Sequence, residues 1–113
     1  MSEIEDDLFK GTVRNLNRLV ILWLLSEETR SGYSILKEMR KIADQNLHPG
    51  VVYPLLHELV SEEYIVGNKV QKGKRQIIYY TITDKGRALF VNLKGLFKLP
   101  VGYVLLELFN KKR

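Results

Sequence analysis

The residues whose chemistry stands out are basic side chains gathered around a glycine late in the chain. Lys72, Lys74 and Arg75 flank Gly73, and the stretch 64–83 that contains them has no acidic residue. Cations at this density can neutralise phosphates, and a net charge of +5 with a pI near 9.5 favours a nucleic acid or an acidic surface as partner. A solvated basic face is the simpler alternative.

Neither catalysis nor metal binding has comparable support in the sequence. His48 and His57 have no serine or carboxylate partner at a motif spacing, and the chain has no glycine-rich phosphate loop. Cysteine is absent, which excludes disulfides and thiolate metal sites, and the carboxylates do not cluster as metal ligands. We therefore expect a binding protein with no metal and no cofactor, and not an enzyme.

Length and composition predict one globular domain. A chain of 113 residues, 45% hydrophobic and 27% charged, is long enough for one core. Acidic residues crowd the beginning of the chain, so residues 1–8 are predicted to form a flexible or loosely docked arm. Because a signal peptide would begin with basic residues, we expect an intracellular, cytoplasmic protein.

The stretch His48–Tyr64 is predicted to be a helix with one buried apolar face and one polar face. Apolar residues recur at i, i+3, i+4 and i+7, the spacing of a helix that buries one side: Val52, Leu55, Leu56 and Leu59. Tyr53 and His57 lie on the opposite face at i, i+4 spacing. Pro54 is close enough to the start of the helix to be tolerated.

An apolar helix is predicted from about Thr12 to Ser26. It is apolar nearly all round between residues 19 and 25, which implies burial on more than one side. The run is far too short to span a bilayer, so no membrane segment is expected. Trp23 is expected in the core; the alternative is that it lines a ligand pocket at a subunit interface.

A second helix is predicted over Gly32–Ala43, with Ser31 as its N-cap. Four apolar residues face inward: Ile35, Leu36, Met39 and Ile42. Tyr33, Lys37 and Arg40 share another face at i, i+4, i+7 spacing, which could also be an ordinary solvated face. A turn over residues 44–48 then leads into the helix described above. Two short helices joined by a tight turn are the helix-turn-helix pattern.

Two β-strands are predicted next, one from Tyr64 to about Val70 and one over Gln76–Thr83, because both are rich in β-branched and aromatic residues. The basic glycine turn lies between them, so the strands form a hairpin with a positively charged tip. Three helices followed by such a hairpin are the order of a winged helix. The predicted fold is therefore mainly α with a small antiparallel β-hairpin.

Three motifs resemble the PadR family of transcriptional regulators. They are Gly32-Tyr33-Ser34-Ile35, the stretch 49–59 (PGVVYPLLHEL) and the stretch 79–86 (YYTITDKG), and the Gly11-Thr12-Val13 start is similar as well. The resemblance covers roughly residues 8–92. It implies a dimeric winged-helix repressor or activator, with a DNA-binding domain over residues 9–83, that binds pseudo-palindromic promoter DNA. It also implies that Tyr33, Tyr53 and the wing bases lie at or near DNA.

Three positions depart from the family pattern. Val51 stands where the family usually has serine or threonine, so a hydroxyl at the start of the third helix is missing. Glu63 stands where a glycine commonly ends that helix; a left-handed residue there costs on the order of 1 kcal/mol, unless the helix ends differently. The wing also lacks the family's frequent proline.

The segment 84–113 is predicted to be a dimerisation helix, capped by Thr83 and interrupted near Leu99 by Pro100 and Gly102. A core of ~80 residues cannot bury all of its apolar residues. The positions expected at a dimer interface are Leu93, Leu96, Phe97, Val101, Val104, Leu105, Leu108 and Phe109. In the family the C-terminal helix packs against its mate and the first helix. The alternatives are that the segment folds back on its own domain or lies on a membrane surface.

The third helix has no lysine or arginine from Pro49 to Tyr64, so it cannot make the common arginine contact to guanine. Affinity is therefore expected from phosphate contacts, and sequence preference from few base contacts and groove shape. The expected DNA-contact residues are Tyr33, Lys37, Arg40, Val51, Tyr53, His57, Lys72, Lys74 and Arg75.

The rival function is a winged-helix module that binds protein or RNA. A small hydrophobic or aromatic effector could lie between Trp23, Phe97 and Tyr103, or that space could be packed shut.

Overall fold

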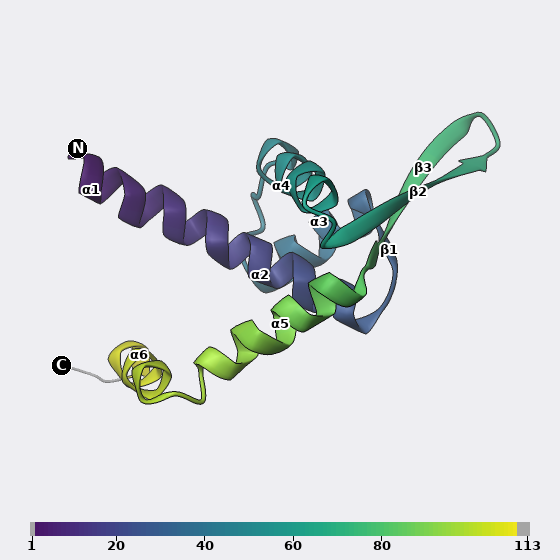
Figure 1. Ribbon diagram of the computed structural model, residues 1–113. Helices are drawn as coiled ribbons and strands as arrows, with labels where there is room; N and C mark the ends of the chain where they lie inside the picture. The colour runs from purple at the N-terminus through teal and green to yellow at the C-terminus, as the bar shows by residue number, and fades with distance from the viewer. Residues whose placement is uncertain (1, 111–113) are drawn as a thin grey trace.

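The computed structural model describes residues 2–110, which form helices around a small antiparallel sheet (Figure 1). The chain begins with helix α1 (Glu3–Asp6), a π-helical turn η1 (Asp7–Gly11) and helix α2 (Thr12–Glu27). The residues at both junctions have right-handed helical dihedrals, so the three segments run as one long helix. The helix therefore starts well before the predicted Thr12, and the expected arm is helical from Glu3.

Helix α2 passes through the middle of the fold and contacts α3, β3 and α5. Four of its apolar residues are buried, Ile21, Leu22, Leu24 and Leu25, and so is the polar Asn17. Trp23, which was expected in the core, is 42% exposed, so that prediction is wrong. The apolar run predicts burial on several sides, but the neighbouring elements leave the side that carries Trp23 partly open.

Strand β1 (Arg30–Ser31) and helix α3 (Gly32–Ile42) follow. The hydroxyl of Ser31 accepts a hydrogen bond from the backbone N–H of Ser34 at 3.1 Å, which confirms the predicted N-cap. Ile35, Leu36 and Met39 are buried as expected. Ile42 is 48% exposed, against the prediction, because it is the last residue of the helix, where the chain turns away from the core.

Helix α4 (Pro49–Ser61) buries the residues that its periodicity predicted: Val52, Leu55, Leu56 and Leu59. Its C-terminal end is closed by two backbone hydrogen bonds, from Glu63 N–H to the carbonyl of Val60 and from Tyr64 N–H to that of Leu59, both 3.0 Å. This ending requires a left-handed residue, and Glu63 takes that conformation with φ of 63°.

The sheet has strand order β1-β3-β2, with β2 (Ile65–Lys72) and β3 (Arg75–Ile82) forming the hairpin. Lys72 pairs with Arg75, so only Gly73 and Lys74 form the turn, and Gly73 has φ of 62°. The hairpin projects from the body of the molecule (Figure 1). Three helices and this wing confirm the predicted winged helix-turn-helix, while β1, which pairs with β3, was not predicted.

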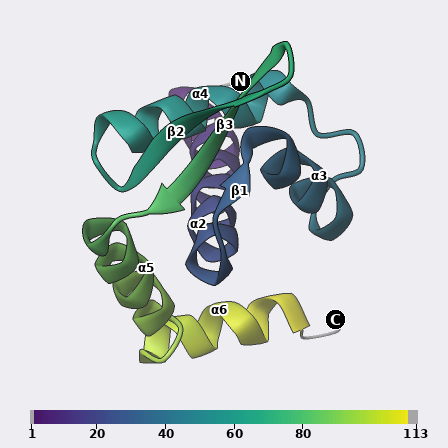
Figure 2. The ribbon, with the colours of Figure 1, turned by 90° about the vertical axis from the view of Figure 1, so that its right-hand side faces the viewer.

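Helix α5 (Asp84–Leu96) starts at Thr83, whose hydroxyl accepts a hydrogen bond from Gly86 N–H at 3.0 Å as predicted. Helix α6 (Pro100–Asn110) follows after a break at residues 97–99, and the two helix axes differ by 70° (Figure 2). Over residues 2–110, no single helix is long and apolar enough to cross a membrane; α5 and α6 reach that length and composition only as a bent pair.

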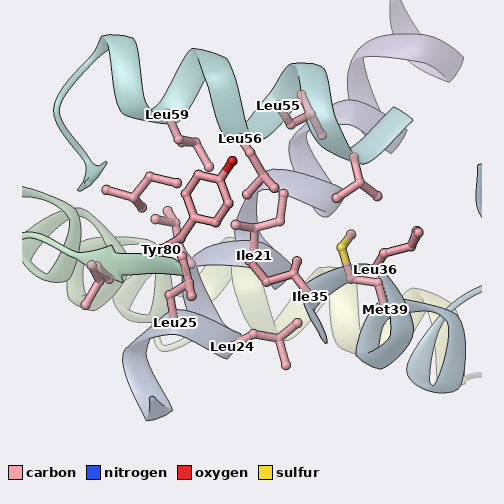
Figure 3. Close-up of a cluster of buried hydrophobic side chains, with 14 of the residues drawn as sticks. Ile21, Leu24, Leu25, Ile35, Leu36, Met39, Leu55, Leu56, Leu59 and Tyr80 are labelled. Atoms are coloured by element: carbon pink, nitrogen blue, oxygen red, sulfur yellow. The ribbon is translucent and has the colours of Figure 1, made fainter. Parts of the chain in front are cut away.

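The core joins α2, α3, α4, the sheet and the start of α5 (Figure 3). Every buried large apolar residue that the structure describes lies between Ile21 and Phe90. Tyr80 of β3 belongs to this core, is 5% exposed, and points its hydroxyl toward α4. The core thus fixes the three elements that carry the predicted DNA-contact residues.

Candidate nucleic-acid interface

Helix α3 presents part of its predicted contact face to solvent. Tyr33 is 65% exposed and Lys37 is also exposed. Arg40 is only half-exposed, because its Nε donates a hydrogen bond to the carbonyl of Leu47 at 2.8 Å. Arg40 therefore holds the turn between α3 and α4, which is a structural role that the spacing of charges did not predict.

The turn into α4 is stabilised by its own polar groups. The carboxylate of Asp44 accepts from Asn46 N–H at 2.9 Å, and Nδ1 of His48 accepts from Gly50 N–H at 2.9 Å. His48 is thus the N-cap of α4. The hydroxyl missing at Val51 is replaced in its capping role by an imidazole three residues earlier, and Val51 itself is 41% exposed.

The outer face of α4 differs from the prediction at one position. His57 is exposed as expected, but Tyr53 is half-buried and packs against the core. The reason lies at the start of α3, where Gly32 has no side chain and leaves room for the tyrosine ring. On another side of α4, Glu58 forms an ion pair with Arg18, which ties this helix to α2.

The wing carries the highest density of exposed cations in the predicted interface. Lys72, Lys74 and Arg75 are all exposed. Lys72 leans on its neighbour: its Nζ donates to the hydroxyl of Tyr79 at 2.8 Å and lies 5.3 Å from the centre of that ring. Lys69, on the same strand as Lys72, is exposed as well and was missed as a candidate, although its place in the basic stretch could have identified it.

A cavity of about 300 Å³ brings four of the predicted contact residues together. It lies between the start of α3, the outer face of α4 and the base of the wing. Among its lining residues are Tyr33, Tyr53, His57, Arg75 and Tyr80. The remaining predicted residues do not line it: Lys37, Arg40, Val51, Lys72 and Lys74.

Tyr80 lies at the inner wall of this cavity. Burial raises the pKa of its phenol above the ordinary value, and the nearby Tyr53 raises it further. Burial thus favours the neutral phenol of Tyr80, and the guanidinium of Arg75 contributes a positive charge to the cavity. This side of the molecule offers hydroxyl groups, an imidazole and cations, which suits phosphate and base edges.

The predicted effector residues are only partly brought together. Trp23 and Phe97 line a cavity of about 280 Å³ with four other residues: Leu19, Val20, Phe90 and Lys94. Tyr103 does not line it and is 62% exposed on α6. Within one chain, the described residues therefore form an apolar site from α2 and α5 and leave Tyr103 out.

The predicted dimerisation residues lie mainly on the surface. Leu93 is half-buried, while the others whose side chains the structure describes are exposed: Leu96, Phe97, Val101, Val104, Leu105 and Leu108. The side chain of Phe109 lies outside the described part of the chain. Helix α6 thus does not bury its apolar side chains against its own domain, contrary to the fold-back alternative.

A family model for the transcriptional regulator PadR-like family matches residues 21–92. Transcriptional regulator YqjI of Escherichia coli is 35% identical over 71 residues, which are 61% of this chain but 33% of that protein. The chain therefore spans about a third of the length of this curated relative.

Solved structures of other proteins have a fold similar to that of this chain. A crystal structure of a transcriptional regulator from Thermoplasma acidophilum covers 91% of this chain and 100% of its own, with a TM-score of 0.76 and 23% identity. Bacillus subtilis PadR in complex with operator DNA matches 67% of this chain and 45% of its own, with a TM-score of 0.61 and 28% identity.

Proposed function

The chain belongs to the transcriptional regulator PadR-like family, and on this premise we propose that it is a homodimeric repressor that binds pseudo-palindromic promoter DNA in the cytoplasm. Its relatives are transcriptional regulators, in agreement with the prediction that it is not an enzyme. The observation that carries the proposal is the surface where α3, α4 and the wing meet, which gathers Tyr33, Tyr53, His57 and Arg75 around one cavity. The structure of Bacillus subtilis PadR with operator DNA supports this choice of partner.

The elements of this surface make different kinds of contact with DNA. Helix α4 has no lysine or arginine on its outer face, so it makes only a few base contacts, through Tyr53 and His57. The wing, with Lys72, Lys74 and Arg75, supplies most of the phosphate contacts. Lys37 adds a contact from α3, while Arg40 contributes by fixing the turn before α4.

The dimer forms through the exposed apolar residues of α5 and α6, of which Val101, Val104 and Leu108 are each more than half exposed. A soluble domain does not usually leave such a continuous apolar surface uncovered. The long first helix carries exposed Leu8, Phe9 and Leu16 and extends the same kind of surface. Two α4 helices in a two-fold dimer should enter DNA grooves about one turn, ~34 Å, apart.

The test is the salt dependence of binding to random-sequence duplex DNA. The logarithm of the binding constant should fall with the logarithm of the salt concentration, with a slope of roughly −0.9 per phosphate neutralised. Replacing both Lys74 and Arg75 by alanine should reduce this slope and weaken binding to all sequences about equally. Lys98→Ala, which removes an exposed cation between α5 and α6, is the matched control and should leave the slope unchanged.

A protein- or RNA-binding winged-helix module is the rival function. It predicts poor binding to duplex DNA even at low salt, and a salt-independent affinity would also contradict our proposal. Binding of duplex selected from a random pool, compared with single-stranded RNA of matched length, separates the two.

We also propose that the apolar site at Trp23 and Phe97 admits a small hydrophobic or aromatic effector when the dimer forms. The site lies next to α5, so a bound molecule would contact the element that we assign to dimerisation. Trp23 is the only tryptophan in the chain, so its fluorescence reports on this site alone. No change in fluorescence with any planar apolar compound would count against an effector there.

A further inference from the structure

We propose that Gly32 is a positioning residue for DNA binding: its missing side chain lets the ring of Tyr53 lie against the start of α3, and this contact sets where Tyr53 meets DNA. The inference rests on the proposed function and assigns a role to a residue that touches no DNA itself. It explains why Tyr53 is half-buried although its helical position predicts an outward side chain.

The contact between Gly32 and Tyr53 leaves no room for even one methyl group. A Cβ atom built on Gly32 would lie 2.8 Å from Cε1 of Tyr53 and 3.5 Å from its hydroxyl oxygen. Carbon atoms in van der Waals contact are about 3.5–4.0 Å apart, so the shorter distance is a clash. The clashing atom belongs to a rigid ring, and the ring must move as a whole to relieve it.

The backbone does not require glycine at this position. Among the described glycines only Gly73 has a positive φ, so Gly32 has a conformation open to any L-residue. Gly32 is also the first residue of α3, directly after the capping Ser31, where other residues are readily accommodated. The requirement for glycine is therefore one of space.

Tyr53 cannot relieve the clash by moving inward. The same Cβ position is 3.5 Å from Cε2 of Tyr80, which is 5% exposed. Tyr80 is in turn confined on its other edge by Gly67, where a Cβ would be 3.4 Å from Cε1. The ring of Tyr80 thus lies between the two glycines and is fixed in the core below α4 (Figure 3), so it does not make way for Tyr53.

The remaining direction for Tyr53 is toward the cavity that it shares with Tyr33, His57 and Arg75. A displaced ring would fill part of this space of about 300 Å³ between the outer face of α4 and the wing. A methyl group at position 32 would therefore disturb the DNA-binding surface without removing any DNA-contacting group.

The experiment is a double-mutant cycle on binding to a duplex selected from a random pool by the unmodified protein. Gly32→Ala should weaken binding about tenfold when Tyr53 is present, and less than about twofold in a Tyr53→Ala background, where the clash is gone. Tyr53→Phe keeps the ring and should keep the full tenfold penalty. An equal loss in the Tyr53 and Tyr53→Ala backgrounds would overturn the proposal.

Thermal unfolding of the same variants separates positioning from stability. A purely structural glycine would lower the melting temperature by the same amount in every background, whereas the proposed contact predicts a loss that disappears with Tyr53→Ala. If Gly32→Ala alone does not fold, restored folding and binding in the double variant supports the proposal, and failure of the double variant refutes it.

Two controls complete the design. Gly95→Ala, at a helical glycine with nothing within 4 Å of the added Cβ, should leave binding unchanged. If the unmodified protein does not bind duplex DNA at low salt, both the proposed function and this inference fall. If it binds but the cycle shows no coupling, only the role of Gly32 falls.

Discussion

Between Ile21 and Phe90 the chain buries the large apolar residues of its core, whereas α1, η1 and α6 carry theirs on the surface. Leu56 of α4 is 0% exposed, while Leu8 is 63% and Val104 is 63% exposed. Both regions are rich in leucine, valine and isoleucine, so composition does not separate them. The winged-helix core is therefore complete in one chain, whereas the two ends leave their apolar residues uncovered, and it is there that we propose a second chain packs.

The largest effect is expected in the core. Leu56→Ala should lower the free energy of unfolding by about 2–5 kcal/mol, because it leaves a cavity among fully buried side chains. Urea unfolding followed by circular dichroism measures the change. Leu8→Ala, at an exposed site of the first helix, is the matched control; an equal loss there at protein concentrations that keep the chain monomeric would contradict the comparison.

The second effect concerns association. Leu105→Lys places a charge on the exposed apolar face of α6 and should weaken the dimer at least about tenfold, or about 1.4 kcal/mol. Sedimentation equilibrium over a range of concentrations measures it. Val70→Lys makes the same change on the wing and should leave the dimer intact. Unchanged association of the Leu105→Lys variant would remove α6 from the interface.

A smaller and opposite effect is expected where the core domain carries backbone strain. Glu63→Gly should stabilise the domain by about 0.5–1 kcal/mol, because φ of 63° strains a residue with a side chain but not glycine. The hydrogen bonds that end α4 do not involve the glutamate side chain, so they should persist. The urea midpoints of the two proteins measure the change. A destabilised variant would show that the glutamate side chain makes a contact that stabilises the fold by more than the backbone strain costs.

The smallest effect at neutral pH is expected from the phenol of Tyr80. Burial raises its folded-state pKa above the ordinary value of about 10, so its contribution to stability is full below that pH and is lost as the pH rises through the folded pKa. Tyr80→Phe should flatten the decline in stability on the alkaline side. Urea midpoints from pH 8 to about 11 test this, and identical profiles for both proteins would show that other groups cause the decline.

The sequence predicted those features that depend on local patterns. The buried face of α4 follows from its apolar spacing, and the caps at Ser31 and Thr83 follow from hydroxyls placed directly before a helix. The family's usual glycine at position 63 left two possibilities open, a left-handed residue or a different helix end, and Glu63 takes the first.

The features that were missed depend on what a distant part of the chain does. Trp23 is 42% exposed because α5 covers its side of α2 only in part, and spacing along one helix does not reveal how closely its neighbours pack. Tyr53 is half-buried because of the space at Gly32, which lies on another helix. The cap at His48 is the exception because it is local: a ring nitrogen accepts from Gly50 N–H two residues on, and this is a less common cap than a hydroxyl or carboxylate.

The two-residue strand β1 has a consequence for how the domain folds. It pairs Arg30 with Tyr80, and next to it the hydroxyls of Thr29 and Thr81, 52 positions apart, lie 2.9 Å from each other. Closing so long a loop costs more chain entropy than forming the helices or the wing hairpin, because their contacts are local. We therefore expect the helices and the hairpin to form early and β1 to dock last, so that native-state hydrogen exchange is faster in β1 than in the paired middle of β2 and β3.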